Sequence, residues 1–262
     1  MRVFGVEFLM ARNFNGTTSV MGVLLGSAGA TFGSVLAKPF SLAAWIRPLN
    51  LGENSSGNII SWQNAGGGGT GYWSFVMLKP STMKFEIDFT GANPAATATD
   101  GTINTGGVWQ HVAMTWDGVG SATAGMRLYR NGVEVSYATR ATSLTFVVNT
   151  HQSLSIGNAR GQAGTFNGDI AHVYFFGREL QSGEVIQLMN HPGSIGAAGS
   201  VTTIGTSGEV GYWPMSGFTG ANVGDFSGNM RAGTMTAMVT GSTEPPVNEQ
   251  FLIGYPCGAL AM

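Results

Sequence analysis

The fold is decided by the stretch MRLYRNGVEV, residues 126–135. Asn131-Gly132 separates two short apolar segments, and these two residues supply the positive φ angles that a type I′ turn requires. The stretch therefore predicts a β-hairpin, in which both flanking segments pair as antiparallel strands.

Strand patterns continue on both sides of this hairpin. Residues 83–89 alternate as a half-buried strand does, with Met83, Phe85, Ile87 and Phe89 on one face and Lys84, Glu86 and Asp88 on the other. Further strands are predicted at residues 40–47, 58–62, 72–78, 109–116, 144–148, 154–156 and 170–176. One helix is predicted from Ser182 to the break at His191-Pro192-Gly193. Closely spaced strands with a single helix predict an all-β sandwich.

Composition excludes several classes of function. Charged residues are 10% of the 262-residue chain, far below the roughly 25% of an ordinary soluble domain. The 41 glycines and many Ser, Thr and Asn residues predict a surface of small neutral polar groups. The net charge of −2 offers no basic field for nucleic acid. No apolar run approaches the roughly 20 residues of a membrane span, so neither nucleic-acid binding nor membrane insertion is expected.

The ends of the chain carry weaker signals. Glu7 interrupts the mildly apolar N-terminus and no small-residue cleavage site follows, so no secretory signal peptide is expected. Cys257 is the single cysteine, which excludes an intramolecular disulfide. Residues 192–208 read as a linker or long loop, and residues 209–262 as further strands followed by an extended tail.

Several motifs occur in a fixed order along the chain. They are Phe14-Asn15-Gly16 with FSLAAWIRP at residues 40–48, WQHVAMTWDG at 109–118, LYRNG at 128–132, and FNGDIAHVY at 166–174 followed by the helix. In this order they resemble the opening strands, central strand, hairpin and closing strand of laminin-G-like domains in the concanavalin A-like lectin/glucanase superfamily. The resemblance implies a concanavalin A-like jelly-roll sandwich of two antiparallel sheets with one short helix, with residues 1–191 as its core. A strand pair that usually comes first in the family resembles residues 211–236 here, so residues 209–262 are expected to complete the sandwich; the alternative is that they form a partial second unit.

The resemblance also implies a range of activities. Such modules bind glycans, proteins or cell surfaces, and some relatives are glycoside hydrolases. Hydrolysis needs two carboxylates that flank the glycosidic bond, and laminarinase-like relatives carry Glu-x-Asp-x-x-Glu on one strand. Glu86-Ile87-Asp88 begins this pattern, but Gly91 stands where the third carboxylate is required. Glu86 and Asp88 are therefore interpreted as the solvated face of a strand, and no enzyme activity is expected.

Two binding sites follow from the resemblance as hypotheses. Many relatives hold a structural calcium, which prefers oxygen ligands, and the places where they do so resemble Asp169, Asp225 and Asn229; an Asx turn explains Asp225 as well. Glycans stack on aromatic faces, and Trp62, Tyr72 and Trp73 flank a Gly-rich loop. The alternative for these three rings is burial in the core.

Three functions stay open. The first is a non-catalytic structural and recognition protein on a virion surface, such as a capsid decoration or adhesin, with self-association or capsid and filament subunits as its partners. It would explain an exterior, low-charge protein that has no signal peptide. The alternative is a soluble carbohydrate-binding, lectin-like module in an extracellular setting. The third is an unusual glycoside hydrolase.

Overall fold

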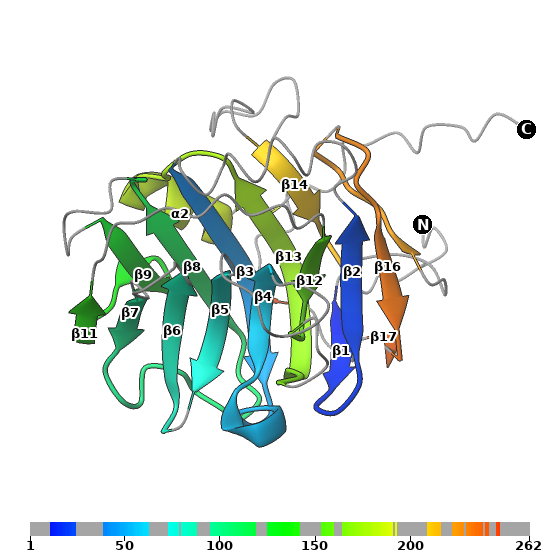
Figure 1. Cartoon of the computed structure of the whole chain (residues 1–262), viewed down its shortest axis with the longest axis horizontal. Coiled ribbons are helices and arrows are strands. Elements are labelled where there is room, and N and C mark those ends of the chain that lie inside the picture. Colours follow the sequence, from blue (N-terminus) through cyan, green and yellow to red (C-terminus); the bar gives the residue numbers. More distant parts are fainter. Residues whose placement is uncertain are drawn as a thin grey trace, which may run out of the picture.

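Two antiparallel β-sheets pack face to face in the computed structural model, with one α-helix outside them (Figure 1). The structure describes residues 11–24, 39–62, 73–78, 80–87, 95–118, 125–141, 153–159, 164–190, 192, 209–215, 222–227, 229–237, 239–240 and 245–246. The predicted all-β sandwich with one short helix is confirmed.

The first sheet has eight strands in the order β10-β9-β8-β3-β13-β1-β17, with β14 also paired to β13. The bounds of these strands are β1 (Arg12–Asn15), β3 (Phe40–Pro48), β8 (Gln110–Trp116), β9 (Met126–Arg130), β10 (Val133–Glu134), β13 (Asn167–Phe176), β14 (Glu209–Trp213) and β17 (Val239–Thr240). The hairpin predicted from residues 126–135 joins β9 to β10. Asn131 and Gly132 have φ angles of 49° and 78°, which are the two positive values of the predicted turn.

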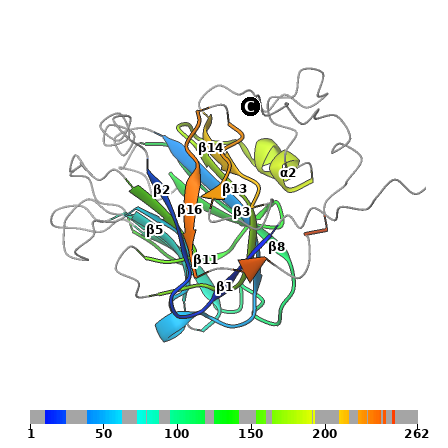
Figure 2. The same cartoon turned by 90° about the vertical axis from the view of Figure 1, so that its right-hand side faces the viewer.

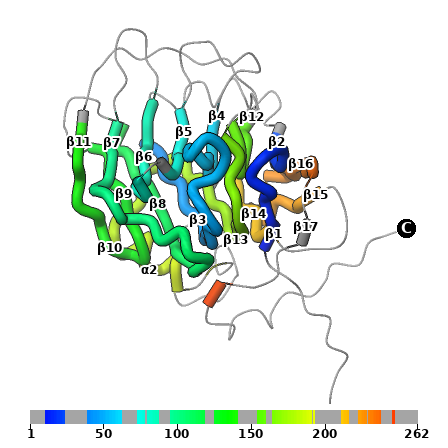
Figure 3. The backbone as a smooth tube through the Cα atoms, turned by 90° about the horizontal axis from the view of Figure 1, so that it is seen from below, coloured from blue at the N-terminus to red at the C-terminus, as the bar shows by residue number. Residues whose placement is uncertain are grey.

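The second sheet has nine strands in the order β11-β7-β6-β5-β4-β12-β2-β16-β15. The bounds are β2 (Val20–Leu24), β4 (Asn58–Trp62), β5 (Trp73–Leu78), β6 (Thr82–Ile87), β7 (Ala95–Ala98), β11 (Tyr137–Ala141), β12 (Ser153–Ile156), β15 (Asn222–Val223) and β16 (Gly233–Thr236). A short 3-10 turn, η2 (Glu53–Ser55), precedes β4. Seen from below, the strands of the two sheets form two rows (Figure 3).

An apolar core fills the space between the sheets. Phe40 on β3 is central to it: its ring lies 5.5 Å from the ring of Trp73 and 5.5 Å from that of Trp116. The predicted alternation of β6 is seen in the described residues, because Met83, Phe85 and Ile87 are buried while Lys84 and Glu86 are partly exposed. The two sheets are therefore held together by close-packed aromatic and aliphatic side chains.

Helix α2 (Ser182–Asn190) covers part of the outer face of the eight-stranded sheet (Figure 2). Its buried residues Val185 and Leu188 pack with Ala43, Tyr129 and Tyr174 of that sheet. At its start, the Glu184 carboxylate accepts a hydrogen bond of 2.9 Å from the backbone N–H of Gln181, which satisfies a donor that the helix itself leaves unpaired. Within the described residues, no helix has the length and apolar character needed to cross a membrane.

The strands after residue 208 pair with strands from the first part of the chain in both sheets. In the eight-stranded sheet, β14 pairs with β13 and β17 pairs with β1. In the nine-stranded sheet, β16 pairs with β2. Residues from both ends of the sequence therefore contribute to each sheet.

Candidate functional site

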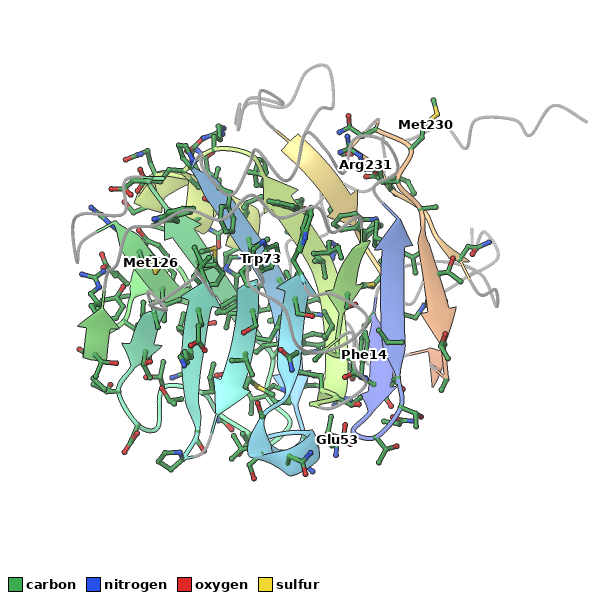
Figure 4. All side chains as sticks on the ribbon, viewed as in Figure 1. Phe14, Glu53, Trp73, Met126, Met230 and Arg231 are labelled. Atoms are coloured by element: carbon green, nitrogen blue, oxygen red, sulfur yellow. The ribbon has the colours of Figure 1, made fainter. Side chains whose placement is uncertain are left out.

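Trp62 and Trp73 do not form a stacking platform. Each side chain is 1% exposed, and their rings lie 6.1 Å apart between the two sheets, where Figure 4 shows Trp73. They are paired residues of β4 and β5 that both point inward. The structure therefore gives no support to the predicted sugar-binding role of these two residues, because both rings are enclosed in the core. Tyr72, the third predicted residue, lies outside the described residues.

Asp169 is buried and bound to protein donors. Its Oδ2 accepts hydrogen bonds from Arg47 Nε at 2.8 Å and from Arg47 Nη2, and its Oδ1 accepts one of 2.8 Å from Asn13 Nδ2. A guanidinium therefore occupies the position beside the carboxylate that the calcium hypothesis assigns to a cation.

Asp225 and Asn229 lie in the loop between β15 and β16. Both Asp225 oxygens accept backbone hydrogen bonds: Oδ1 from Ser227 at 2.9 Å and from Tyr212 at 3.1 Å, and Oδ2 from Arg231 at 2.9 Å. This is the Asx turn that the sequence offered as the alternative. Asn229 bonds to the Ser227 hydroxyl through its side-chain nitrogen at 3.0 Å.

The predicted calcium ligands therefore do not fit a calcium ion. The carboxylate oxygens of Asp169 and Asp225 bond to protein donors, and Asp169 belongs to a different network from Asp225 and Asn229. Across the described ranges, no three or more His, Cys, Asp or Glu side chains are grouped so that they could hold a metal. Calcium binding at these residues stays a prediction without structural support.

The Asp225 loop also displays apolar side chains. Phe226 is 62% exposed and Met230 is 92% exposed, and Met230 has a φ of 56°. Met230 and Arg231 lie at the end of the sandwich opposite Glu53 (Figure 4).

A polar row crosses four strands on the outer face of the eight-stranded sheet. Asn13 pairs with Asp169, and Asp169 pairs with Arg47. Ile46 pairs with Gln110, and one further step of this antiparallel register brings Trp109 beside Arg47. Trp109 packs against the cluster of Trp45 and Ala171, which lies on the same outer face. We call Trp109, Arg47, Asp169 and Asn13 the outward row.

Trp109 differs from the other tryptophans of the chain. The chain has six, all within the described residues, and the other five are at most 5% exposed. Trp109 is partly exposed, and the preceding residue, Val108, is exposed. The loops beneath it are joined by a hydrogen bond of 2.9 Å from the Gly107 N–H to the Pro48 carbonyl. The outward row therefore begins at an accessible indole on a fixed loop.

Gly168 allows the strands of the outward row to lie close together. Its φ is 137°, a conformation that side chains rarely adopt. A β-carbon at this position would collide with the carbonyl oxygen of Arg47. The glycine thus permits the close approach of β13 and β3 that places Asp169 under Arg47.

Two buried histidines lie next to the outward row. The ring of His111 lies 5.6 Å from that of Trp45, and His172 Nδ1 lies 2.8 Å from the Tyr212 hydroxyl. Burial lowers the pKa of both imidazoles from 6.5 to about 3, and for His111 the nearby His172 is a second, smaller cause of this shift. Both are therefore neutral at pH 7, which leaves Arg47 and Asp169 as the charged side chains that point outward from the described residues of β1, β3, β8 and β13.

The outer face of the nine-stranded sheet is polar and has a different character. Lys84 Nζ lies 2.6 Å from Glu86 Oε2, and Thr97 stands between Lys84 and Thr139 in register. The side chains that point outward from β4 to β7 are hydroxyl, aliphatic or charged, and within the described parts of these strands none is aromatic. Glu86 is thus in an ion pair on a partly solvated face, as expected; Asp88 lies outside the described residues.

The sequence matches a family model over residues 25–186, which is more than half of the chain. The model is that of the concanavalin A-like lectin/glucanases superfamily, laminin-G type. This chain belongs to that family. The resemblance of the ordered motifs to laminin-G-like domains is thereby confirmed.

Solved structures with the same fold are distant in sequence. A Bacteroides ovatus protein, named as a candidate carbohydrate-binding protein, has 18% identity and a TM-score of 0.59; the match covers 91% of this chain and 61% of that one. The present chain therefore spans about three fifths of the Bacteroides ovatus protein. The Ruminococcus gnavus IT-sialidase CBM40, bound to alpha2,3 sialyllactose, has 14% identity and a TM-score of 0.51, with 69% and 98% of the two chains covered.

A third solved structure with a similar fold is part of an enzyme. It is the leech intramolecular trans-sialidase, with 19% identity and a TM-score of 0.51 over 69% of this chain and 27% of that one. At these identities the likeness concerns the fold alone. No curated protein sequence matches this chain.

The outward row was not foreseen as a binding surface. The sequence predicts Asp169 as a metal ligand, and it indicates only strand motifs for Trp109 and Arg47. A signal was present, because Trp109 lies at the start of a predicted strand after Gly106-Gly107, where a side chain is less enclosed than in mid-strand.

Proposed function

We propose that this chain is a non-catalytic carbohydrate-recognition module that binds glycan through the outward row. The single observation that carries the proposal is the position of Trp109: it is the one partly exposed tryptophan, and it lies beside a polar network of Arg47, Asp169 and Asn13. A flat apolar surface next to fixed polar groups is the pattern of small-molecule recognition.

The chemistry of a sugar ring matches these groups. One face of a pyranose presents C–H groups, which pack on an indole, while its edge presents hydroxyls that both donate and accept hydrogen bonds. Arg47 and Asn13 supply N–H donors on either side of Asp169. Asp169 already holds both side chains, so little rotamer freedom remains to be lost when a ligand binds.

The similar structures support this choice over the virion role. The Ruminococcus gnavus CBM40 was solved with a sialyllactose, and the Bacteroides ovatus protein is named for carbohydrate binding. Nothing in the comparisons or in the described residues supports a capsid decoration, a filament subunit or self-association. We therefore place the lectin-like alternative first, and we place the module outside the cell because its ligand would be an extracellular glycan.

Hydrolysis has less support than binding. Glu86 is engaged by Lys84, and Asp169 is engaged by Arg47 and Asn13. A hydrolase needs a carboxylic acid and a second carboxylate on either side of one bond. The outward row offers one carboxylate, which is buried and already accepts three hydrogen bonds.

The proposal is tested on a glycan array with the whole protein and two variants. We expect wild type to bind a defined set of glycans, Trp109→Ala to lose this binding, and Trp109→Phe to retain part of it. Lys84→Ala, on the other sheet, is the control and should bind as wild type does. Absence of binding to any glycan, or unchanged binding by a folded Trp109→Ala variant, would overturn the proposal.

A further inference from the structure

We infer that the outward row recognises a neutral saccharide through its hydroxyls, and that it discriminates against sialylated and other anionic sugars. This inference rests on the proposed function and adds the chemical class of the ligand. It differs from the ligand bound to the Ruminococcus gnavus CBM40, which is a sialyllactose.

The charge of the outward row is balanced. Arg47 contributes one positive charge and Asp169 one negative charge, and the two are joined by hydrogen bonds from Nε and Nη2. Histidines 111 and 172 add no charge at pH 7, because both are buried and neutral. The surface therefore offers no net positive field that would attract an anionic ligand.

A carboxylate on the ligand would compete with Asp169 for the same cation. The Arg47 side chain is 18% exposed, whereas the Asp169 side chain has no exposure. An anionic sugar placed over Arg47 would have its charge close to a buried carboxylate, and like charges near a low-dielectric interior repel strongly. The sugar carboxylate would also lose its hydration without gaining an unshared partner.

Neutral hydroxyls have no such cost. A hydroxyl both donates and accepts, so it can bond to the Arg47 or Asn13 N–H groups without disturbing the Arg47–Asp169 pair. Asn13 is partly exposed and is held by Asp169 Oδ1 at 2.8 Å, which fixes the direction of its amide. Arg47 on β3 and Asn13 on β1 flank Asp169 on β13, so hydroxyls of a bound saccharide would meet two oriented side chains two strands apart, while a sugar ring rests on Trp109 just before β8.

The test compares matched ligands by isothermal titration calorimetry with the whole protein. The glycans that bind on the array are taken in neutral form and with a terminal sialic acid, and lactose with 3′-sialyllactose serves as a reference pair. We expect the neutral glycans to bind at least about tenfold more tightly than their sialylated forms. We also expect affinity to change less than about twofold between low salt and 0.5 M NaCl, because no charge is transferred to the site.

Asp169→Asn supplies the second arm, because it removes the negative charge and leaves Arg47 unbalanced. We expect the folded Asp169→Asn variant to bind sialylated glycans more tightly than wild type does. The ratio between its affinities for neutral and for sialylated glycans should therefore be smaller than in wild type. Tighter binding of sialylated than neutral glycans by wild type, or strong weakening by salt, would overturn this inference while leaving carbohydrate recognition intact. Absence of binding to either form would overturn both proposals.

Discussion

The buried carboxylate of Asp169 and the partly exposed guanidinium of Arg47 form an ion pair that joins strands β3 and β13, with Arg47 Nε lying 2.8 Å from Asp169 Oδ2. Asn13 on β1 bonds to the other oxygen of the same carboxylate. One carboxylate thus ties three neighbouring strands together and orients the two donors of the outward row. Stability and ligand recognition depend on the same group, so experiments must measure both.

Asp169→Asn is expected to lower the free energy of unfolding by about 2 kcal/mol, because the buried carboxylate accepts three hydrogen bonds that a neutral amide makes less well, and the partly buried Arg47 loses its counter-charge. Urea unfolding at pH 7 measures this loss. Glu86→Gln is the matched control: its partner Lys84 is partly exposed, so the loss should stay below about 1 kcal/mol. Equal losses in the two variants would contradict the structural difference between the two pairs.

Glu53→Gln is expected to loosen the connection between η2 and the start of β13. Glu53 Oε2 accepts hydrogen bonds from the Thr165 and Gly164 N–H groups at 3.1 and 3.0 Å, and these bonds lower the pKa of the carboxyl below 4.5. The carboxylate therefore stabilises the fold above pH 4.5, and this contribution is lost as the pH falls through the lowered pKa.

At pH 7 the Glu53→Gln variant should be about 1–2 kcal/mol less stable than wild type. Urea unfolding curves of both proteins at pH 7 and near pH 3 measure the difference, which should shrink in acid. A difference that stays constant with pH would show that the charge of Glu53 is not the stabilising feature.

Histidines 111 and 172 are expected to make the fold sensitive to acid. The unfolded chain binds protons below pH 6.5, whereas the folded chain resists protonation of these two rings until about pH 3. The two histidines therefore leave the free energy of unfolding unchanged above pH 6.5. As the pH drops from 6.5 toward 3, each histidine lowers the free energy of unfolding by about 1.4 kcal/mol per pH unit.

Urea midpoints between pH 6.5 and 5 test this dependence before most carboxylates titrate. His111→Phe removes one of the two groups and should roughly halve the slope of stability against pH. A midpoint that does not move over this range in wild type would mean that the imidazoles are not buried as neutral groups.

Trp73→Ala is expected to destabilise the protein by about 3–5 kcal/mol, because it removes a large ring from the centre of the core. Trp109→Ala should cost about 1 kcal/mol, since its indole is partly in solvent. Thermal unfolding monitored by circular dichroism gives the melting temperatures of the two variants, and we expect that of Trp73→Ala to be the lower one. Similar melting temperatures for both variants would contradict the assignment of Trp73 to the core and Trp109 to the surface.

Much of the fold could be predicted from short-range patterns. The turn at Asn131-Gly132 could be predicted from these two residue types alone, because both tolerate positive φ angles. Strand β6 could be predicted from its alternating sequence, because one face of this strand is buried and the other is partly exposed. Strand β2 was not predicted, and neither were β7 and β11, because Ala95–Ala98 and Tyr137–Ala141 carry few β-branched or large apolar residues. The predicted strand at residues 144–148 lies outside the described residues.

The candidate site was harder to predict, because its residues meet only through sheet pairing. The four residues of the outward row are far apart in sequence. They are aligned by the register of three strand pairs: β1 with β13, β13 with β3, and β3 with β8. The residue types alone could not tell that Asp169 faces a guanidinium rather than a metal. Trp62 and Trp73 beside a Gly-rich segment looked accessible, yet both strands turn these rings inward.

The most direct test of carbohydrate recognition by the outward row is NMR of the six indole N–H groups during titration with a glycan selected on the array. Trp109→Phe assigns the Trp109 signal. We predict that this signal shifts progressively and saturates, while the signals of the buried Trp62, Trp73, Trp116 and Trp213 stay in place. A saturating interaction in which the Trp109 signal does not move would contradict the assignment of the site.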